Sequence, residues 1–294
     1  DFKKDDIATW GAEDFHKIVG ELYLKSLKDD KLLKLTKLQP FDAIITKGNV
    51  RYLRPTLFDL LANRALGYFE NDERDIKKPA YAFEIGQASA FDPAADFITK
   101  KFTTGDSSSL QHKALVIYQQ LISFHLNDIK PDALIDADIQ RLKFVKDKSV
   151  HPDKDNLYLN AVKHIAHQYE NLRVAAQAWY LMAAYYNEKA DGYKPYGDTT
   201  YRFDRIKAKE ICEKILKYND ISKVSSTGGG LEGAINCYNL LNNINRQSLQ
   251  FSIEKVNIPD QPFRALVEYR NINQLYLRLI RPDEKLKTLL ENQY

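Results

Sequence analysis

The spacing of hydrophobic residues changes once along this chain, and the change separates two kinds of structure. Up to about Gln247 the hydrophobic residues recur every three or four positions, whereas beyond it they recur at every second position. A step of two places alternate side chains on opposite faces of a β-sheet, and a step of 3.6 builds one face of an α-helix. The sequence therefore predicts a helical body over 1–247, β-strands within 248–282, and a tail over 283–294.

The alternating pattern covers three short segments, 249–255, 263–270 and 275–280. Three short strands cannot bury a hydrophobic core of their own. Their free edges are expected to fold back on the helical body or to pair with a second chain. We therefore expect the chain to be a piece of a larger protein. Because residue 1 is Asp and not Met, we also expect the N-terminus to have been trimmed or processed.

The composition predicts a folded and soluble chain. Hydrophobic residues make up 44% and charged residues 28% of the 294 positions, which is ordinary for globular proteins. The 43 basic and 40 acidic residues give a net charge of +3, too balanced to indicate a nucleic-acid partner. No apolar run approaches the roughly 20 residues that span a bilayer, so no transmembrane segment is expected in this part.

The helical body is predicted to be a solenoid of antiparallel helix pairs. Its segments carry stripes of alternating small and bulky residues and are joined by short loops, as in α-solenoids. The pair over 172–217 is the most similar to a tetratricopeptide repeat, but the irregular period makes the fold class TPR-like and mainly α, followed by a short truncated β segment. Pro55 is placed in the first turn of one helix, and Asp106-Ser107-Ser108 is expected to cap another. Solenoids of this kind usually bind or brace other proteins.

Two cysteines lie on predicted buried stripes. Cys212 and Cys237 each belong to a set of hydrophobic residues with i, i+3, i+4, i+7 spacing. We expect two buried free thiols, because Cys behaves as a small hydrophobic residue in cores. A disulfide between neighbouring helices is the alternative, and the lack of a CxxC pair or a nearby His argues against a metal site.

The run His151-Pro152-Asp153 is the signature turn of J-domain cochaperones, and a helix with Arg141, Lys143 and Lys146 precedes it. The resemblance is incomplete, since the characteristic opening motif of that family is absent. The alternative is a Pro-Asp turn that starts the next helix.

Other motifs are weaker. The run Gly228-Gly229-Gly230-Leu231-Glu232-Gly233 lacks the Lys-Ser/Thr of a phosphate-binding loop and is interpreted as a flexible loop. His164 and His167 are expected on a solvated helix face, and His125 is expected to be a core histidine with one hydrogen bond. No catalytic triad, carboxylate pair or zinc-ligand set is evident, so we expect no enzyme activity, no cofactor and no metal.

The loop Tyr193-Lys194-Pro195-Tyr196 carries aromatic side chains that suit a protein-contact surface. The alternative is an ordered loop that packs its own tyrosines. Together with aromatic and basic positions of the β segment, it completes the predicted set of protein-contact residues: Tyr193, Tyr196, Phe263, Arg264, Tyr269 and Tyr276.

Three stretches, 53–66, 136–145 and 258–272, together resemble the N-terminal region of alpha-2-macroglobulin-like proteins of Bacteroidetes-type bacteria. The last stretch is similar to the start of the first macroglobulin-type β-sandwich, with 275–278 as its next strand. The resemblance implies a periplasmic or cell-envelope protein, lipid-anchored in the parent chain, that traps a protease. This part would then be a non-enzymatic scaffold whose partners are the rest of the parent chain and the target protease.

The family's capture residues have no counterpart in this stretch. Its thioester motif is Cys-x-x-Gln, whereas Cys212 is followed by Glu213-Lys214-Ile215 and Cys237 by Tyr238-Asn239-Leu240. Two alternative functions stay open, a free-standing α-solenoid adaptor and a J-domain-like cochaperone.

Overall fold

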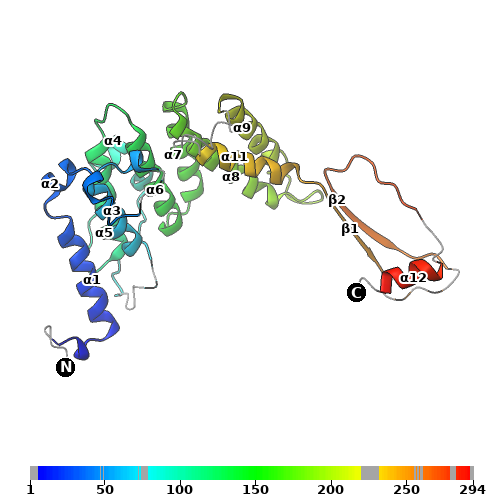
Figure 1. Ribbon diagram of the computed structural model, residues 1–294, viewed down its shortest axis with the longest axis horizontal. Helices are drawn as coiled ribbons and strands as arrows, with labels where there is room; N and C mark the ends of the chain where they lie inside the picture. The colour runs from blue at the N-terminus through cyan, green and yellow to red at the C-terminus, as the bar shows by residue number, and fades with distance from the viewer. Residues whose placement is uncertain are drawn as a thin grey trace. The chain divides into compact units, whose positions relative to one another are not determined.

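The computed structural model describes residues 6–46, 48, 50–71, 73, 79–219, 232–254, 256, 258, 261–278 and 283–291. The chain divides into two compact units, residues 1–241 and 242–294 (Figure 1). The first unit is helical, and the second contains a two-stranded antiparallel sheet, so the mainly helical class with a small β segment is confirmed.

The longer elements of the described chain follow one another in this order: α1 (Ala12–Ser26), α2 (Asp30–Leu35), α3 (Leu57–Phe69), α4 (Ala94–Phe97), α5 (Leu110–His125), α6 (Asp132–Lys148), α7 (Lys154–Gln168), α8 (Ala176–Lys189), α9 (Asp204–Tyr218), α11 (Glu232–Asn245), β1 (Ser248–Ile253), β2 (Ala265–Arg270) and α12 (Glu284–Glu291). Short 3-10 turns lie at Ile7–Thr9, Gln39–Phe41, Arg51–Leu53, Ala88–Phe91, Arg173–Ala175 and Ala190–Gly192. No described helix combines the length and the apolar character that crossing a bilayer requires.

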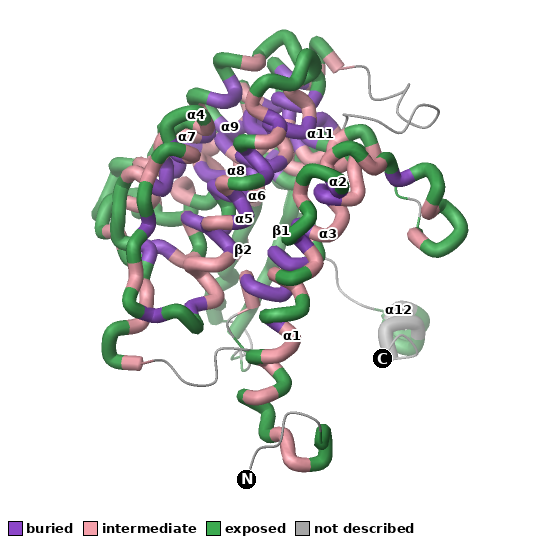
Figure 2. Tube along the Cα trace, turned by 90° about the vertical axis from the view of Figure 1, so that its left-hand side faces the viewer, coloured by how far each residue is buried: buried purple, intermediate pink, exposed green. Residues whose placement is uncertain are grey.

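In the first unit the long helices up to α9 pack mainly against their neighbours in the chain. The packed pairs run α3–α5, α5–α6, α6–α7, α7–α8 and α8–α9, with α1 and α2 both against α3. Buried positions therefore form a continuous core between successive helices (Figure 2). Packing between sequence neighbours is what a solenoid requires, while the TPR-like arrangement itself stays a prediction.

The start of α3 differs from the prediction, because Pro55 lies before the cap and not in the first turn. Thr56 is the N-cap, and its hydroxyl oxygen accepts a hydrogen bond from the Asp59 backbone N–H. The Asp59 carboxylate accepts the Thr56 backbone N–H in return, at 2.9 Å. This reciprocal capping box fixes the first helical residue at Leu57.

The cap of α5 is also one residue beyond the predicted run. Ser109 accepts the His112 backbone N–H at 3.2 Å and is the N-cap. Asp106 instead accepts the Ser108 backbone N–H at 3.0 Å, which forms the turn leading into the helix.

Gly233 lies inside α11, although the sequence suggested a flexible loop. A Cβ atom at this position would lie 2.2 Å from the backbone carbon of Ala176 and 2.2 Å from the backbone nitrogen of Gln177, at the start of α8. The Asn236 amide also donates to the side-chain oxygen of Gln177. Gly233 therefore permits α11 to contact the α8 backbone directly, while the predicted loop at 228–231 lies outside the described residues.

The second unit contains a ribbon of two strands. β1 pairs antiparallel with β2, from Ser248 opposite Arg270 to Ile253 opposite Ala265. After β2 the chain turns at Asn271, whose φ of 55° lies in the left-handed region. The Asn271 amide donates to the carbonyl oxygens of Ile244 and Arg246, which ties the end of the ribbon to the end of α11.

The predicted third strand over 275–280 is not a strand where the structure describes it. Residues 275–278 have no regular structure, and 279–280 lie outside the described residues. An alternating pattern becomes a strand only when a neighbouring strand supplies its hydrogen bonds. In the described part of this unit, β1 and β2 pair with each other and with no third strand.

Candidate functional site

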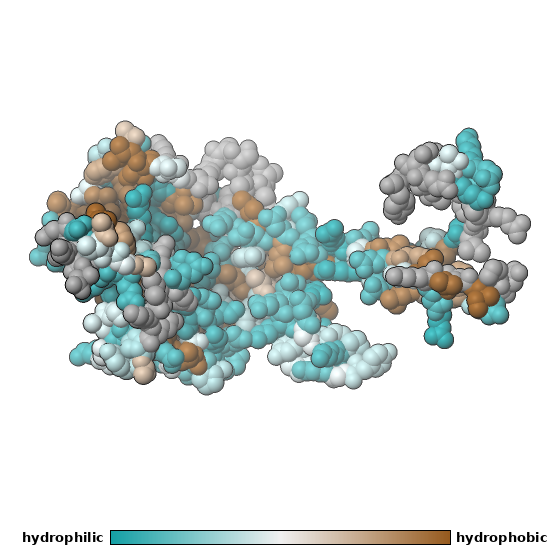
Figure 3. All heavy atoms as spheres, turned by 90° about the horizontal axis from the view of Figure 1, so that it is seen from below, coloured by the Kyte–Doolittle hydropathy of each residue, from teal (hydrophilic) through white to brown (hydrophobic). Residues whose placement is uncertain are grey.

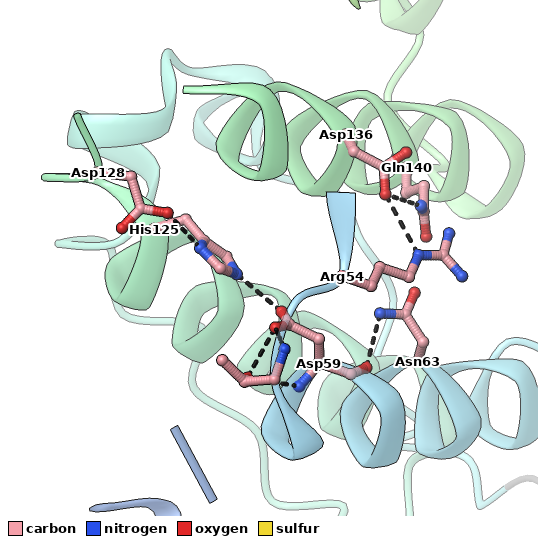
Figure 4. Close-up of polar contacts among 8 residues, drawn as sticks. Arg54, Asp59, Asn63, His125, Asp128, Asp136 and Gln140 are labelled. Atoms are coloured by element: carbon pink, nitrogen blue, oxygen red, sulfur yellow. Dashed lines mark hydrogen bonds and ion pairs between the residues drawn. The ribbon is translucent and has the colours of Figure 1, made fainter. Parts of the chain in front are cut away.

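A buried polar cluster joins the start of α3 to the end of α5 (Figure 4). Its centre is His125, which is 2% exposed. The Nε2 atom lies 2.7 Å from Asp59 Oδ1, and Nδ1 lies 2.7 Å from Asp128 Oδ2. The expectation of a buried histidine is confirmed, but the expected single hydrogen bond is wrong. The turn after α5 brings Asp128 back to the second ring nitrogen.

The surrounding groups hold Asp59 and Asp136 in fixed positions. The Thr56 hydroxyl donates to Asp59 Oδ2, and the Asn63 amide donates to the Asp59 carbonyl oxygen. Arg54 and Gln140 both donate to Asp136 Oδ2, at 3.3 and 2.8 Å. These polar groups therefore satisfy one another inside the fold.

The space inside this cluster is too small for a substrate. The cavity lined by Asp59, His125 and Asp136 has a volume of about 10 Å³, which is about the space for one water molecule. Among the described residues, His125 contacts two carboxylates and no hydroxyl or thiol that it could activate. The arrangement can bind and release a proton, and it braces the junction of α3 with α5.

The protonation of His125 gives this junction a pH dependence. Burial lowers the pKa of His125, but the hydrogen bonds and charges of Asp59 and Asp128 outweigh burial and raise the pKa above its ordinary value. Protonation of His125 therefore stabilises the folded state. The full stabilisation is present below about pH 6.5, the pKa of histidine in the unfolded chain, and it is lost as the pH rises through the higher pKa of His125 in the folded protein. We expect the free energy of unfolding to fall over that interval by at most about 1.4 kcal/mol per pH unit.

Urea unfolding at a series of pH values from about 5 to about 9 measures this effect, with roughly half-unit steps across the interval above the unfolded histidine pKa. The His125→Asn variant should have a lower free energy of unfolding than the wild type, and its free energy of unfolding should no longer fall across this pH interval. The matched control is His167→Asn, because His167 is exposed on α7 and contacts neither Asp59 nor Asp128. Two results would contradict the stabilising role of protonated His125. One is a wild-type free energy of unfolding that rises with pH across this interval, and the other is the same pH dependence in the His125→Asn variant.

A second buried polar group lies on α6, and sequence reasoning missed it. Arg141 is completely buried, and its Nη1 donates to the Ala90 carbonyl oxygen at 2.6 Å. Its Nη2 lies 2.6 Å from Asp138 Oδ1, and the angle between them leaves neither atom with a hydrogen bond. The guanidinium carbon also lies 4.3 Å from the Phe97 ring centroid. The available signal was the i, i+3 pair of opposite charges beside a hydrophobic stripe.

Asp138 also borders a cavity of about 300 Å³ between α4, α6 and α7. Burial raises the pKa of this carboxyl group, and the charges of Arg141 and His164 oppose that effect. Arg141 is thus the main partner of Asp138. The remaining lining is mostly apolar: Pro93, Ala94, Ala95, Leu126, Leu134, Ile135, His164, Ile165, Gln168 and Tyr169.

The His151-Pro152-Asp153 turn separates α6 from α7 and starts the second of these helices. Asp153 is the N-cap of α7, as the turn interpretation predicted, although its side chain accepts no helix N–H. Its carboxylate accepts the Asn156 amide instead, and His151 Nδ1 accepts the Asp153 backbone N–H at 3.1 Å. Pro152 and Asp153 are exposed. The cochaperone interpretation stays an untested alternative.

Two further histidines and the two cysteines lie where the sequence placed them. His164 and His167 are exposed, and His167 contacts the Trp179 ring edge-on at 4.9 Å between centroids. Cys212 and Cys237 are free and completely buried. A hydrogen bond with Cys212, together with burial, raises the pKa of the Cys237 thiol. Within the described ranges no three His, Cys, Asp or Glu residues come together as a metal site.

The predicted protein-contact residues divide between the two units. Tyr196 is fully exposed in the loop before α9, while Tyr193 is half-buried. The other four belong to the second unit and are all exposed: Phe263, Arg264, Tyr269 and Tyr276.

The ribbon has one apolar face and one largely polar face. Paired residues share a face, so Leu249 lies beside Tyr269, Phe251 beside Val267, and Ile253 beside Ala265. The opposite face pairs Ser248 with Arg270, Gln250 with Glu268, and Ser252 with Leu266. Phe251 is 53% exposed and Tyr269 is 64% exposed, and hydrophobic atoms reach the surface of this unit in Figure 3.

No protein-family model, curated protein sequence or solved structure matches this chain.

Proposed function

We propose that this chain is a non-enzymatic scaffold and protein-contact region of a large bacterial alpha-2-macroglobulin-like protease inhibitor. The observation that carries the proposal is the exposed apolar face of the β1–β2 ribbon. Leu249, Phe251 and Ile253 project from one face and are each at least half exposed. A ribbon with such a face is stable when a second layer covers it.

The alternation in this ribbon is the pattern of a β-sandwich strand. In a sandwich the inward faces of two sheets pack about 10 Å apart, and the outward faces stay polar. Each apolar side chain that becomes buried contributes about 1.5–3 kcal/mol, so completion of the sandwich is strongly favoured. The resemblance of 258–272 to the first macroglobulin-type sandwich identifies the missing layer as further strands of the parent protein.

The helical unit supports the scaffold role. The polar groups of the His125 cluster bond to one another, and their cavity of about 10 Å³ leaves no room for a substrate. A compact helical body that leads into a sandwich fits the first part of a large trap. From the same resemblance, the proposed location is the periplasm or the cell envelope, with a lipid anchor in the parent protein.

A pair of substitutions in the ribbon tests the proposal. Phe251→Asp changes the apolar face and Gln250→Asp the polar face of the same strand. In the present chain neither substitution should change the unfolding temperature of the helical unit, because both positions lie outside it. In the complete parent protein only Phe251→Asp should lower the unfolding temperature and weaken retention of a cleaving protease. Native gel mobility and the activity of the retained protease on a small peptide measure that retention.

A parent reading frame that encodes no further β-sandwich repeats would overturn the proposal and favour a free-standing helical adaptor. Equal effects of the two substitutions in the parent would mean that the apolar face is not an inward sandwich face.

A further inference from the structure

A surface cleft of about 390 Å³ lies where α6, α7 and α8 meet, within the first unit. We call it the lysine cleft, and it is lined by Lys143, Lys146, Asp147, Lys154, Tyr158 and Leu181. It lies apart from the His125 cluster, which shares none of these residues.

The cleft is positively charged, because three lysines face one aspartate. The Asp147 carboxylate forms an ion pair with Lys148, with 3.0 Å between Oδ2 and Nζ, and the Asp147 side chain is 71% exposed. The negative charge of Asp147 is therefore partly neutralised. Lys143 makes no ion pair or hydrogen bond with the described residues and projects into solvent. Lys146 Nζ lies 5.0 Å from the Tyr158 ring centroid and 4.0 Å from a Glu188 carboxylate oxygen, which is the limit of an ion pair.

Two further donors complete the lining. Lys154 Nζ gives one hydrogen bond to the Ser149 carbonyl oxygen at 2.9 Å, so two of its three N–H groups remain for a ligand. Tyr158 is 4% exposed, yet its hydroxyl has no hydrogen-bond partner within the described part of the chain. The hydroxyl oxygen is not one of the fully buried unpaired atoms of the described chain, so it reaches the surface of the cleft and can donate to an acceptor there.

The Tyr158 hydroxyl remains a donor at physiological pH. Burial, and then the nearby Glu188 charge, raises the pKa of Tyr158 to about 12. The hydroxyl is therefore neutral and can donate to an anion. The ring of Tyr158 and the Leu181 side chain supply the apolar surface of the cleft.

We propose that the lysine cleft binds an acidic segment of a partner protein. Carboxylates of the segment meet Lys143, Lys146 and Lys154, one of them accepts the Tyr158 hydroxyl, and a neighbouring apolar side chain packs against Leu181. A peptide fits better than a small inorganic anion, because the cleft has a volume of about 390 Å³ and combines donors from α6 and α7 with the apolar side chain of Leu181 from α8. This proposal rests on the proposed function of the chain as a protein-contact region, and it specifies that the bound partner segment is acidic.

Fluorescence anisotropy with the whole chain tests the proposal. The probe is a fluorescein-labelled peptide of alternating Glu and Leu residues, and the control peptide carries Gln in place of Glu. We expect binding of the Glu peptide only, with an affinity that falls as salt increases. Lys143→Glu should weaken it by about tenfold or more. The matched control is Lys163→Glu on α7, whose Nζ lies against the Tyr186 ring and outside the cleft, and it should leave the affinity within about twofold.

Tyr158→Phe is the sharper variant, since it removes only an oxygen atom that no described protein group uses. We expect about threefold weaker peptide binding or more, and an unchanged or higher unfolding temperature. Equal weakening by Lys143→Glu and Lys163→Glu, no effect of Tyr158→Phe, or full competition by millimolar phosphate would each overturn the acidic-segment assignment. The protease-retention assay tests the β1–β2 ribbon and not this cleft. A negative result for peptide binding therefore leaves the proposed function standing, and a negative result for retention does not decide whether the cleft binds an acidic segment.

Discussion

Replacing Arg141 with Met is expected to lower the free energy of unfolding by about 4 kcal/mol, because the substitution leaves a buried carboxylate without its counter-charge. Arg141 is completely buried and pairs with Asp138, which is 5% exposed. The Met side chain also removes the donor to the Ala90 carbonyl oxygen. Urea unfolding at about pH 7, followed by circular dichroism, measures the loss.

The double variant Arg141→Met with Asp138→Leu separates charge from packing. Removal of both charges should recover at least about half of the loss, since paired apolar groups can replace a buried ion pair at little cost. Lys143→Met is the matched control, because Lys143 lies exposed on the same helix, and it should change stability by less than about 0.5 kcal/mol. A double variant as unstable as Arg141→Met alone would contradict the charge argument.

The Arg141→Met variant should also respond to pH in a defined direction. Burial already raises the pKa of Asp138 with Arg141 present, and loss of the guanidinium raises it further. The folded variant then holds its proton at pH values where the unfolded carboxyl, with a pKa of about 3.9, has released it. Because the Asp138 pKa is raised in the wild type as well, both proteins lose stability in parallel just above about pH 4. The deficit of the variant should grow only once the pH exceeds the folded pKa of Asp138 in the wild type, until the higher folded pKa of the variant is passed.

Gly233→Ala is expected to be the most disruptive alanine substitution among the described glycines, with a loss of about 3 kcal/mol. The new Cβ would meet the Ala176 backbone carbon and the Gln177 backbone nitrogen, each at 2.2 Å. Backbone atoms at the start of α8 cannot move aside as a flexible side chain would. We expect α11 to separate from α8 and the hydrogen bond between Asn236 and Gln177 to break.

Gly67→Ala provides the control, because a Cβ on this exposed α3 residue meets nothing within 4 Å. That substitution should stabilise the helix by about 0.5–1 kcal/mol through helix propensity alone. Denaturant midpoints of the two variants measure the contrast, and hydrogen exchange of the α11 amides locates it. Similar stability changes for the two glycines would show that the close contact between α8 and α11 is absent.

Periodicity in the sequence was enough to predict where most of the longer helices of the described chain and the ribbon lie, but it did not predict the short helix α2. The stripes that contain Cys212 and Cys237 predicted two buried thiols, and both residues are buried and free. The strand predicted from alternation is absent at 275–278. Alternating hydrophobic residues give a strand one apolar face, but the strand forms only where a neighbouring strand supplies hydrogen bonds. The starts of α3 and α5 lie slightly later than predicted, since Thr56 and Ser109, rather than the expected residues, supply the caps.

The polar interior was decided by tertiary structure. His125 and Asp59 are 66 positions apart, and Arg141 and Ala90 are 51 positions apart, so no local pattern pairs them. The role of Gly233 could not be predicted from the sequence either, because the lack of a side chain matters only where the α8 backbone packs against this residue.

Hydrophobic spacing is a property of neighbouring residues, so the sequence by itself determined that this chain forms a helical body followed by an amphipathic β-ribbon. The partners of buried charges, the space beside a glycine and the grouping of lysines around Tyr158 depend on distances between segments far apart in the chain. Only the packing of α3, α5, α6, α7, α8 and α11 in the folded chain sets those distances.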